Sequence, residues 1–132
     1  MADAVTSQTI QDGSRKAVLK FTNISDGSGE SAVAKVDVSA LSPSAEGLTC
    51  SRVTLNKVWY AIDGMQVQMF FNASTNVFIL ELSGTSDLLD FSSFSGIPNN
   101  AGSGVNGDIL FTTVGHGSGD TYSIILEVIK HY

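Results

Sequence analysis

The 132-residue chain has few basic residues and a single cysteine. Seven Lys and Arg stand against thirteen Asp and Glu, which gives a formal net charge of −6. The cations are scattered, and only Arg15 and Lys16 are adjacent. Because phosphate binding needs clustered Lys and Arg, this charge pattern argues against nucleic acid as the main partner. Cys50 cannot form an internal disulfide, and we expect it to be a small residue at the start of a strand.

The chain also lacks an apolar run near the roughly 18 residues of a membrane-spanning helix, so we expect no membrane partner. Segment 1–14 has neither the basic nor the apolar region of a signal peptide, which predicts synthesis in the cytoplasm without export by that route. No repeat and no linker divides the sequence. Its length therefore predicts a single domain over 1–132, with 1–6 as a flexible or partner-docked arm.

Sustained helical periodicity is absent, and short β-compatible runs alternate with glycine-rich turns. This spacing predicts an all-β fold: an antiparallel β-sandwich with jelly-roll-like connections and about eight strands. An up-and-down barrel is the alternative, but the long connections Ser39–Thr49 and Ser95–Gly107 disfavour it. The expected strands are Ser7–Gln11, Lys16–Thr22, Ala32–Val38, Arg52–Ile62, Met65–Asn72, Asn76–Ser83, Leu88–Phe94, Asp108–Val114 and Asp120–Lys130.

Two turns predict hairpins. Asp63-Gly64 lies between the strands 52–62 and 65–72, and the glycine turn Gly115–Gly119 lies between the last two strands. Alternation within the strands predicts which side chains point to the core. We expect these to be Ala34, Val36 and Val38, with Lys35 and Asp37 outward, and also Val67, Met69, Phe71, Phe78, Leu80, Leu82, Tyr122, Ile124, Leu126 and Val128.

The run Arg52–Ile62 is apolar on both faces. One face is expected to carry Val53, Leu55, Trp59 and Ala61, and the other Val58, Tyr60 and Ile62. Two apolar faces indicate either burial on both sides or an interface on one side. The sequence therefore predicts a candidate subunit or capsid interface at Val58, Tyr60, Ile62 and Phe70.

Motifs for metals and cofactors are weak. The segment Asp26–Glu30 offers two carboxylates, whereas calcium needs about six to eight oxygens, so a turn is favoured. His116 and His131 lack zinc-ligand spacing. The glycine loop Gly102–Gly107 is followed by a strand and by Asp108, which would repel phosphate. We predict neither a metal nor a cofactor.

Catalytic motifs are also missing, and no G-x-S-x-G nucleophile turn occurs. A hydrolase would need His116 beside two carboxylates, and nothing in the sequence places them together. We therefore expect no catalytic residue and no enzymatic activity. The aromatics Trp59, Tyr60, Phe70 and Phe71 could stack on a sugar or contact a protein, although packing within the sheets is the favoured role.

From about Gln11 onward, several motifs resemble small virion structural proteins of tailed bacteriophages. The motifs are Val36-Asp37-Val38-Ser39-Ala40-Leu41, Val58-Trp59-Tyr60-Ala61, Gly64-Met65-Gln66-Val67, Asn100-Ala101-Gly102, Gly107-Asp108-Ile109-Leu110-Phe111-Thr112-Thr113 and Gly119-Asp120-Thr121-Tyr122.

This resemblance implies a capsid decoration, or cement, protein on the virion surface. Its implied partners are the phage major capsid protein and further copies of itself, since such proteins often form homotrimers over capsomer junctions. A tail or neck location is an alternative within the same resemblance. A carbohydrate-binding head-fibre or tail-associated module is the alternative of a different class.

Overall fold

The computed structural model describes residues 4–13, 15–25, 27, 30, 32–43, 46–73, 75–83, 86–91, 93, 96–98, 108–115 and 117–131. These residues form nine strands in two antiparallel sheets, which confirms the predicted all-β sandwich. The strands are β1 (Ala4–Asp12), β2 (Lys16–Ile24), β3 (Val33–Val36), β4 (Arg52–Asp63), β5 (Gln66–Phe71), β6 (Val77–Leu82), β7 (Ser86–Asp90), β8 (Ile109–Val114) and β9 (Thr121–His131).

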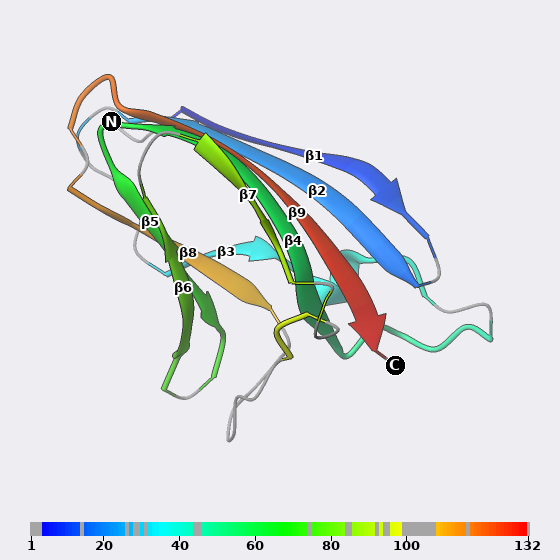
Figure 1. Ribbon diagram of the computed structural model, residues 1–132. Coiled ribbons are helices and arrows are strands. Elements are labelled where there is room, and N and C mark those ends of the chain that lie inside the picture. The colour runs from blue at the N-terminus through cyan, green and yellow to red at the C-terminus, as the bar shows by residue number, and fades with distance from the viewer. Residues whose placement is uncertain are drawn as a thin grey trace.

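The two sheets face each other as layers (Figure 1). The first has the order β1-β2-β9-β4-β7 and the second the order β3-β8-β5-β6. From β2 to β9 the pairing is nested, because β2 pairs with β9, β3 with β8, β4 with β7 and β5 with β6. Two separate sheets rule out the alternative of an up-and-down barrel for the described strands.

Most predicted strands are found within a few residues of their expected ends. The main extension is β1, whose residues Ala4 to Thr6 pair with Ile24 to Thr22, so this part of the expected arm is a strand. Between β3 and β4 the irregular connection contains one short 3-10 helix, Val38–Ala40, near the helical turn expected there. In the part of the chain that the structure describes, no helix is long and apolar enough to span a membrane.

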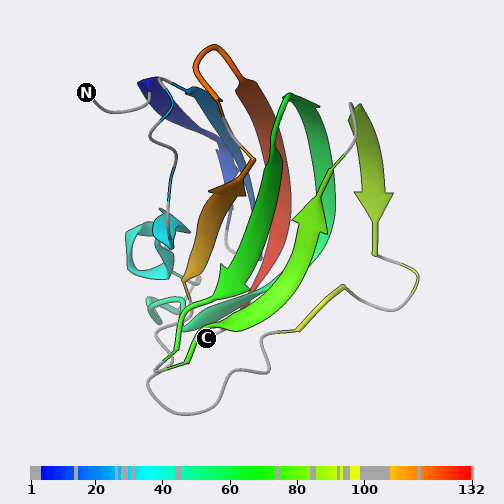
Figure 2. The ribbon, with the colours of Figure 1, turned by 90° about the vertical axis from the view of Figure 1, so that its left-hand side faces the viewer.

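Both predicted hairpins are wrong. The turn at Gly64 leads from β4 in one sheet to β5 in the other, and the turn at Gly115 to Gly119 leads from β8 to β9 in the same way (Figure 2). Gly64 has φ +87°, and the carboxyl group of Asp120 occupies the space beside it. Asp120 Oδ2 also accepts a hydrogen bond from the Gly117 amide at 2.7 Å, which holds this carboxyl group within the β8–β9 turn.

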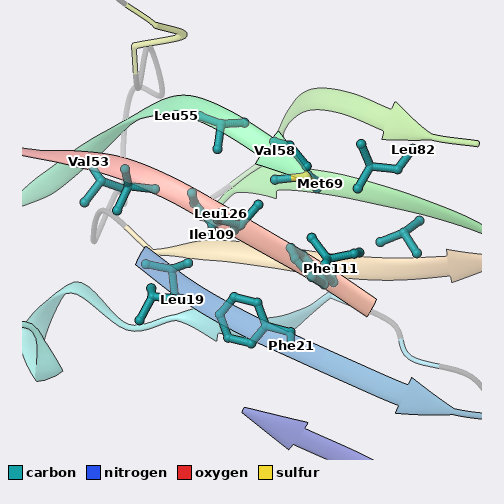
Figure 3. Packing of buried hydrophobic residues seen from close by; sticks show 14 of the residues in the cluster. Leu19, Phe21, Val53, Leu55, Val58, Met69, Leu82, Ile109, Phe111 and Leu126 are labelled. Carbon is teal, nitrogen blue, oxygen red and sulfur yellow. The ribbon is translucent and has the colours of Figure 1, made fainter. Parts of the chain in front are cut away.

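The core lies between the sheets and contains the inward side chains of nearly every strand (Figure 3). The predicted face of β9 is confirmed, since Tyr122, Ile124, Leu126 and Val128 are all buried. Ring contacts connect the two layers. Phe111 of β8 packs edge-on against Phe21 of β2 at 5.6 Å and against Tyr122 at 6.0 Å between ring centroids.

A β-bulge in β4 overturns the predicted division of its faces. The register with β9 shifts between Leu55 and Lys57, so alternation restarts one residue later. Val53 and Leu55 therefore share the core-facing side with Val58 and Ile62, and all four are buried. Trp59 and Ala61 point to the opposite, outer side, which the uninterrupted alternation of the sequence could not predict.

Two further inward assignments are wrong. Ala34 is exposed, whereas the Lys35 side chain is buried and its ammonium lies 2.5 Å from Glu30 Oε2. Phe78 is 51% exposed, because the register of β5 and β6 shifts between Met69 and Phe70. In both cases an irregular register changes the face that a side chain occupies.

A buried ammonium group fixes the end of the β1–β2 hairpin. Lys130 Nζ is fully buried and donates to the Asp12 carboxylate, to the Gly13 carbonyl and, at 3.1 Å, to the Ser42 carbonyl. The Asp12 carboxylate also accepts from the Ser42 amide at 2.9 Å. These bonds join β1, the 38–43 connection and β9 at one point.

Candidate binding surfaces

The structure separates the four predicted interface residues. Val58 and Ile62 lie in the core, which leaves them unavailable to a partner of the folded chain. Tyr60 is half-buried against the same core, and its hydroxyl donates to the Ser83 carbonyl at 3.0 Å. Phe70 is the member of the set that lies on an outer face, where it contacts Phe78.

The outer face of the five-stranded sheet is organised in rows that cross the strands. In one row Ile125 of β9 is opposite Trp59 of β4, and Trp59 is opposite Leu88 of β7. We call these three residues the Trp59 row. Leu88 is 47% exposed, and the other two are partly exposed. An outward row of large apolar side chains is unusual for the solvent face of an antiparallel sheet, where polar residues are typical.

A row of small side chains lies beside the Trp59 row. Ser123 is opposite Ala61, and Ala61 is opposite Ser86, on the same three strands. Because these side chains are short, they leave an open hollow of about 410 Å³ along Trp59, which we call the Trp59 hollow. Its lining residues are Lys20, Trp59, Tyr60, Ala61, Ser86, Asp87, Leu88, Ser123 and Ile125.

A charged row borders the other side of the Trp59 row. Glu127 lies opposite Lys57 and is largely buried, with Lys16 Nζ at 3.3 Å and Lys57 Nζ at 4.0 Å. Asn56 Nδ2 also donates to Glu127 at 2.8 Å. These contacts balance the negative charge of the buried Glu127 carboxylate within the sheet. The charged row therefore marks the limit of the apolar surface on that side.

The four-stranded sheet carries a second apolar row on its own outer face. Phe70 of β5 is opposite Leu110 of β8 and Phe78 of β6. The rings of Phe70 and Phe78 meet edge-on with centroids 5.4 Å apart. We call Leu110, Phe70 and Phe78 the Phe70 row. The neighbouring row is polar, with Gln68 donating to Glu81 at 3.2 Å.

The four aromatics considered for stacking on a sugar, Trp59, Tyr60, Phe70 and Phe71, do not form one surface. Trp59 lies on the outer face of one sheet, Phe70 on the outer face of the other, and Phe71 in the core between them. Trp59 thus remains a candidate for ligand contact by itself. Two smaller hollows, of about 130 and 270 Å³, lie between β1, β2 and β3, beside Ser7, Phe21 and Lys35.

Burial shifts the pKa values of three ionisable groups, Cys50, His131 and Asp108. Burial raises the pKa of the Cys50 thiol, which disfavours the nucleophilic thiolate. Burial and the nearby Arg52 lower the pKa of His131, whose Nε2 lies 2.6 Å from Thr54 Oγ1. Burial, followed by the charge of Asp37, raises the pKa of Asp108 despite a hydrogen bond from the Val38 amide.

Among the described residues no group of three or more His, Cys, Asp or Glu could hold a metal ion. Several candidates from the sequence, however, lie outside the described residues: His116, the loop 99–107 and most of the segment 26–29. Of the segment 26–30, Gly27 and Glu30 are described, and the Glu30 carboxylate accepts hydrogen bonds from the Tyr122 hydroxyl and from Asn23 Nδ2.

Phe70, a predicted interface residue, does lie in one of the two apolar rows. The rows themselves were not predicted, because a cross-strand row exists only once strand order and register are known. The apolar faces of 52–62 also pointed to an outward apolar surface but assigned it to the wrong side. No protein-family model matches the chain, and neither the curated proteins nor the solved structures yield a match.

Proposed function

We propose that the protein is a non-enzymatic structural protein of a tailed-phage virion, a decoration protein that binds the major capsid protein and stabilises the head. The observation that carries this proposal is the presence of an apolar row on the outer face of each sheet. A monomer that functions alone has no need to expose Trp59 and Leu88 on one side and Phe78 on the other.

Two opposite apolar rows suit a protein that has two kinds of neighbour. One row would bind the capsid, and the other would bind a second copy in a closed ring such as a trimer. Protein interfaces are rich in aromatic side chains at their centre and polar at their rim, and both rows have this composition. The residue resemblance to phage virion proteins supports the same role.

The finer fold assignment is part of this proposal. We propose that the sandwich is a jelly roll, because a jelly roll folds one long antiparallel pair of chain segments into two facing sheets. The nested pairing of β2 with β9 through β5 with β6 supports it.

The test is binding of purified protein to expanded phage heads that lack it, measured by co-sedimentation. Trp59→Glu and Phe78→Glu each place a charge in one row, and we expect one variant to lose head binding and the other to lose self-association. Gln11→Glu and Gln66→Glu are the matched controls, since both residues are exposed and each adds a charge to one of the two faces outside the rows. Unchanged binding and unchanged oligomer size in both row variants would reject the proposal.

A carbohydrate-binding head-fibre or tail-associated module is the second candidate. The specific observation that favours it is the partial exposure of Trp59 beside a hollow with hydroxyl groups. Imaging of whole virions distinguishes the two roles, because a decoration protein occupies the head surface in a regular array and a tail module does not.

A further inference from the structure

The outer edge of the five-stranded sheet is formed by β1, which among the described strands pairs with β2 alone (Figure 1). One side of its backbone therefore presents amide and carbonyl groups on which a further strand can be added. Val5 to Gln11 are all exposed, even though Val5, Ser7 and Thr9 lie opposite buried residues of β2. Their inner side is open because β3, the nearest edge of the second sheet, has only four residues.

The strand β1 lacks the features that protect the edges of sheets. Such edges are usually short, or they carry charged side chains that oppose pairing with another chain. Of the other described edge strands, β3 is short, β6 carries Glu81, and β7 carries Asp87 and Asp90. The segment 4–11 of β1 contains no charged residue. We propose that β1 pairs in antiparallel orientation with β1 of a second copy and joins the two five-stranded sheets into one.

The charge of the protein favours this edge for contact between copies. With a net charge of −6, copies repel one another, so carboxylates are unfavourable where two copies meet. Pairing of β1 with β6 or β7 of another copy would bring Glu81 or Asp87 beside a strand that has no cation. The one acid of β1, Asp12, is already bonded to Lys130.

The sequence of β1 also suits pairing with itself. Its register with β2 is uninterrupted over residues 4–9. An antiparallel pair centred on Ser7 places Thr6 opposite Gln8 of the other copy, and opposite residues lie on the same face, as a continuous sheet requires. Thr and Gln side chains can hydrogen-bond across such a pair, and no like charges meet.

The contact consists of one short strand from each copy, so we expect a weak interaction, with a Kd of about 0.1 mM. Dilute protein then leaves β1 uncovered, and pairing becomes important where copies are concentrated, as in an assembly. Neither apolar row takes part, so the inference does not rest on the proposed function. Loss of head binding in the row variants would leave β1 pairing intact, and loss of β1 pairing would leave head binding intact.

Amide hydrogen exchange measures the coverage of β1 directly. We compare the exchange rates of the β1 amides at about 5 µM and at about 1 mM protein. With a Kd of about 0.1 mM, about one fifth of the chains remain unpaired at the higher concentration. We therefore expect the β1 amides to exchange about fivefold more slowly at 1 mM than at 5 µM.

Charge reversal identifies both the partner and the register. Thr6→Glu combined with Gln8→Glu places carboxylates opposite each other, and we expect the concentration dependence to disappear. Thr6→Lys combined with Gln8→Lys should do the same, whereas an equimolar mixture of the two variants should restore the slow exchange. Gln66→Glu combined with Thr75→Glu is the matched control, since it adds two charges at exposed positions outside β1. All four altered residues are exposed, so the fold is retained.

Three results would overturn the inference. The first is an exchange rate of the β1 amides that is the same at both concentrations. The second is a concentration dependence that the paired Glu substitutions in β1 leave unchanged, or that the mixture of oppositely charged variants does not restore. The third is slow exchange of β1 already at 5 µM that persists in the Glu variant, because β1 would then be covered by a different molecule.

Discussion

The Lys130 side chain makes three polar contacts at one buried point of the molecule. Its ammonium is fully buried among the Asp12 carboxylate and two carbonyl groups. A buried ammonium is tolerated only when it is paired and hydrogen-bonded, and here both conditions are met. Removal of this one group leaves three acceptors without their donor.

We expect Lys130→Met to lower the free energy of unfolding by about 2–4 kcal/mol, because it leaves the Asp12 charge partly buried and without its partner. Urea denaturation at pH 7 measures the change. Lys57→Met is the control, because the Lys57 ammonium lies 4.0 Å from the Glu127 carboxylate and its side chain is about one third exposed. We expect this substitution to lower the free energy of unfolding by about 0–1 kcal/mol. Equal effects of the two substitutions would contradict the argument.

Asp12 makes stability depend on acid pH. Burial alone raises the pKa of this carboxyl, but the hydrogen bonds from Lys130 and Ser42 outweigh it and hold the pKa below its ordinary value of 3.8. The unfolded chain therefore takes up this proton first as the pH falls. The contribution of the Asp12 carboxylate to stability is complete at pH values above the ordinary pKa, and it is lost as the pH falls through the pKa of the folded protein.

The corresponding measurement compares unfolding free energies of the protein and of Asp12→Asn from about pH 6 down to about pH 2. We expect the variant to be less stable at the upper end and the difference to shrink below about pH 4. A difference that stays constant over the whole range would show that the Asp12 charge is not the cause.

Gly64 combines a left-handed backbone with a crowded site. Its φ is +87°, and a Cβ atom there would overlap the carboxyl group of Asp120. That carboxyl group accepts a hydrogen bond from the Gly117 amide. We expect Gly64→Ala to lower the free energy of unfolding by about 2–4 kcal/mol, because the backbone strain and the overlap with Asp120 act together. Gly119→Ala isolates the strain, since φ is +90° and nothing lies within 4 Å, and should cost about 1–2 kcal/mol. Thermal unfolding of both variants tests whether Gly64→Ala destabilises the protein more than Gly119→Ala.

The strands show how far prediction from sequence reached. Alternation in β9 and β5 identified their buried faces, because both run without interruption across the core. The β4 bulge and the β5–β6 register shift reversed the assignments of Trp59 and Phe78. The alternation of apolar and polar residues does not reveal where a β-bulge inserts an extra residue, so the sequence pattern alone could not predict which side chains of β4 and β6 face the core.

The positions of the turns could be predicted, but not which strands pair across them. The glycine at position 64 and those at 115 and 119 do mark sharp turns with positive φ. Whether such a turn makes a hairpin or a passage between layers depends on which strands pair, and that is decided by contacts distant in sequence. The Trp59 hollow depends on the same long-range register, which is why its lining could not be assembled from the sequence.

The strands of the five-stranded sheet should differ in local stability. β9 lies between β2 and β4 and buries one face completely, whereas Val5 to Gln11 of the outer strand β1 are all exposed. We expect amide hydrogen exchange in β1 to be at least about a hundredfold faster than in the centre of β9. Mass-spectrometric or NMR exchange at pH 7 measures this ratio. Equal protection would indicate that β1 is covered in solution by another molecule.

The nested pairing also predicts slow folding. Partners such as Lys16 and Ile129 are about 110 positions apart, so pairing β2 with β9 requires the closure of a long loop, at a cost in chain entropy. We expect refolding to take roughly 10 ms to several seconds, as for other sandwiches dominated by distant contacts. Stopped-flow fluorescence of Trp59 reports the step at which β4 joins β9 and β7. Complete refolding in microseconds would contradict this expectation.

The row of small side chains beside Trp59 has a consequence for how this protein can change over generations. Ala61, Ser123 and Ser86 point away from the core, so their sizes can vary with little effect on folding. Each substitution alters the depth of the hollow directly. The stability of the fold and the shape of this outer surface are therefore controlled by different residues of the same strands, so the surface can change through single substitutions while the fold is preserved.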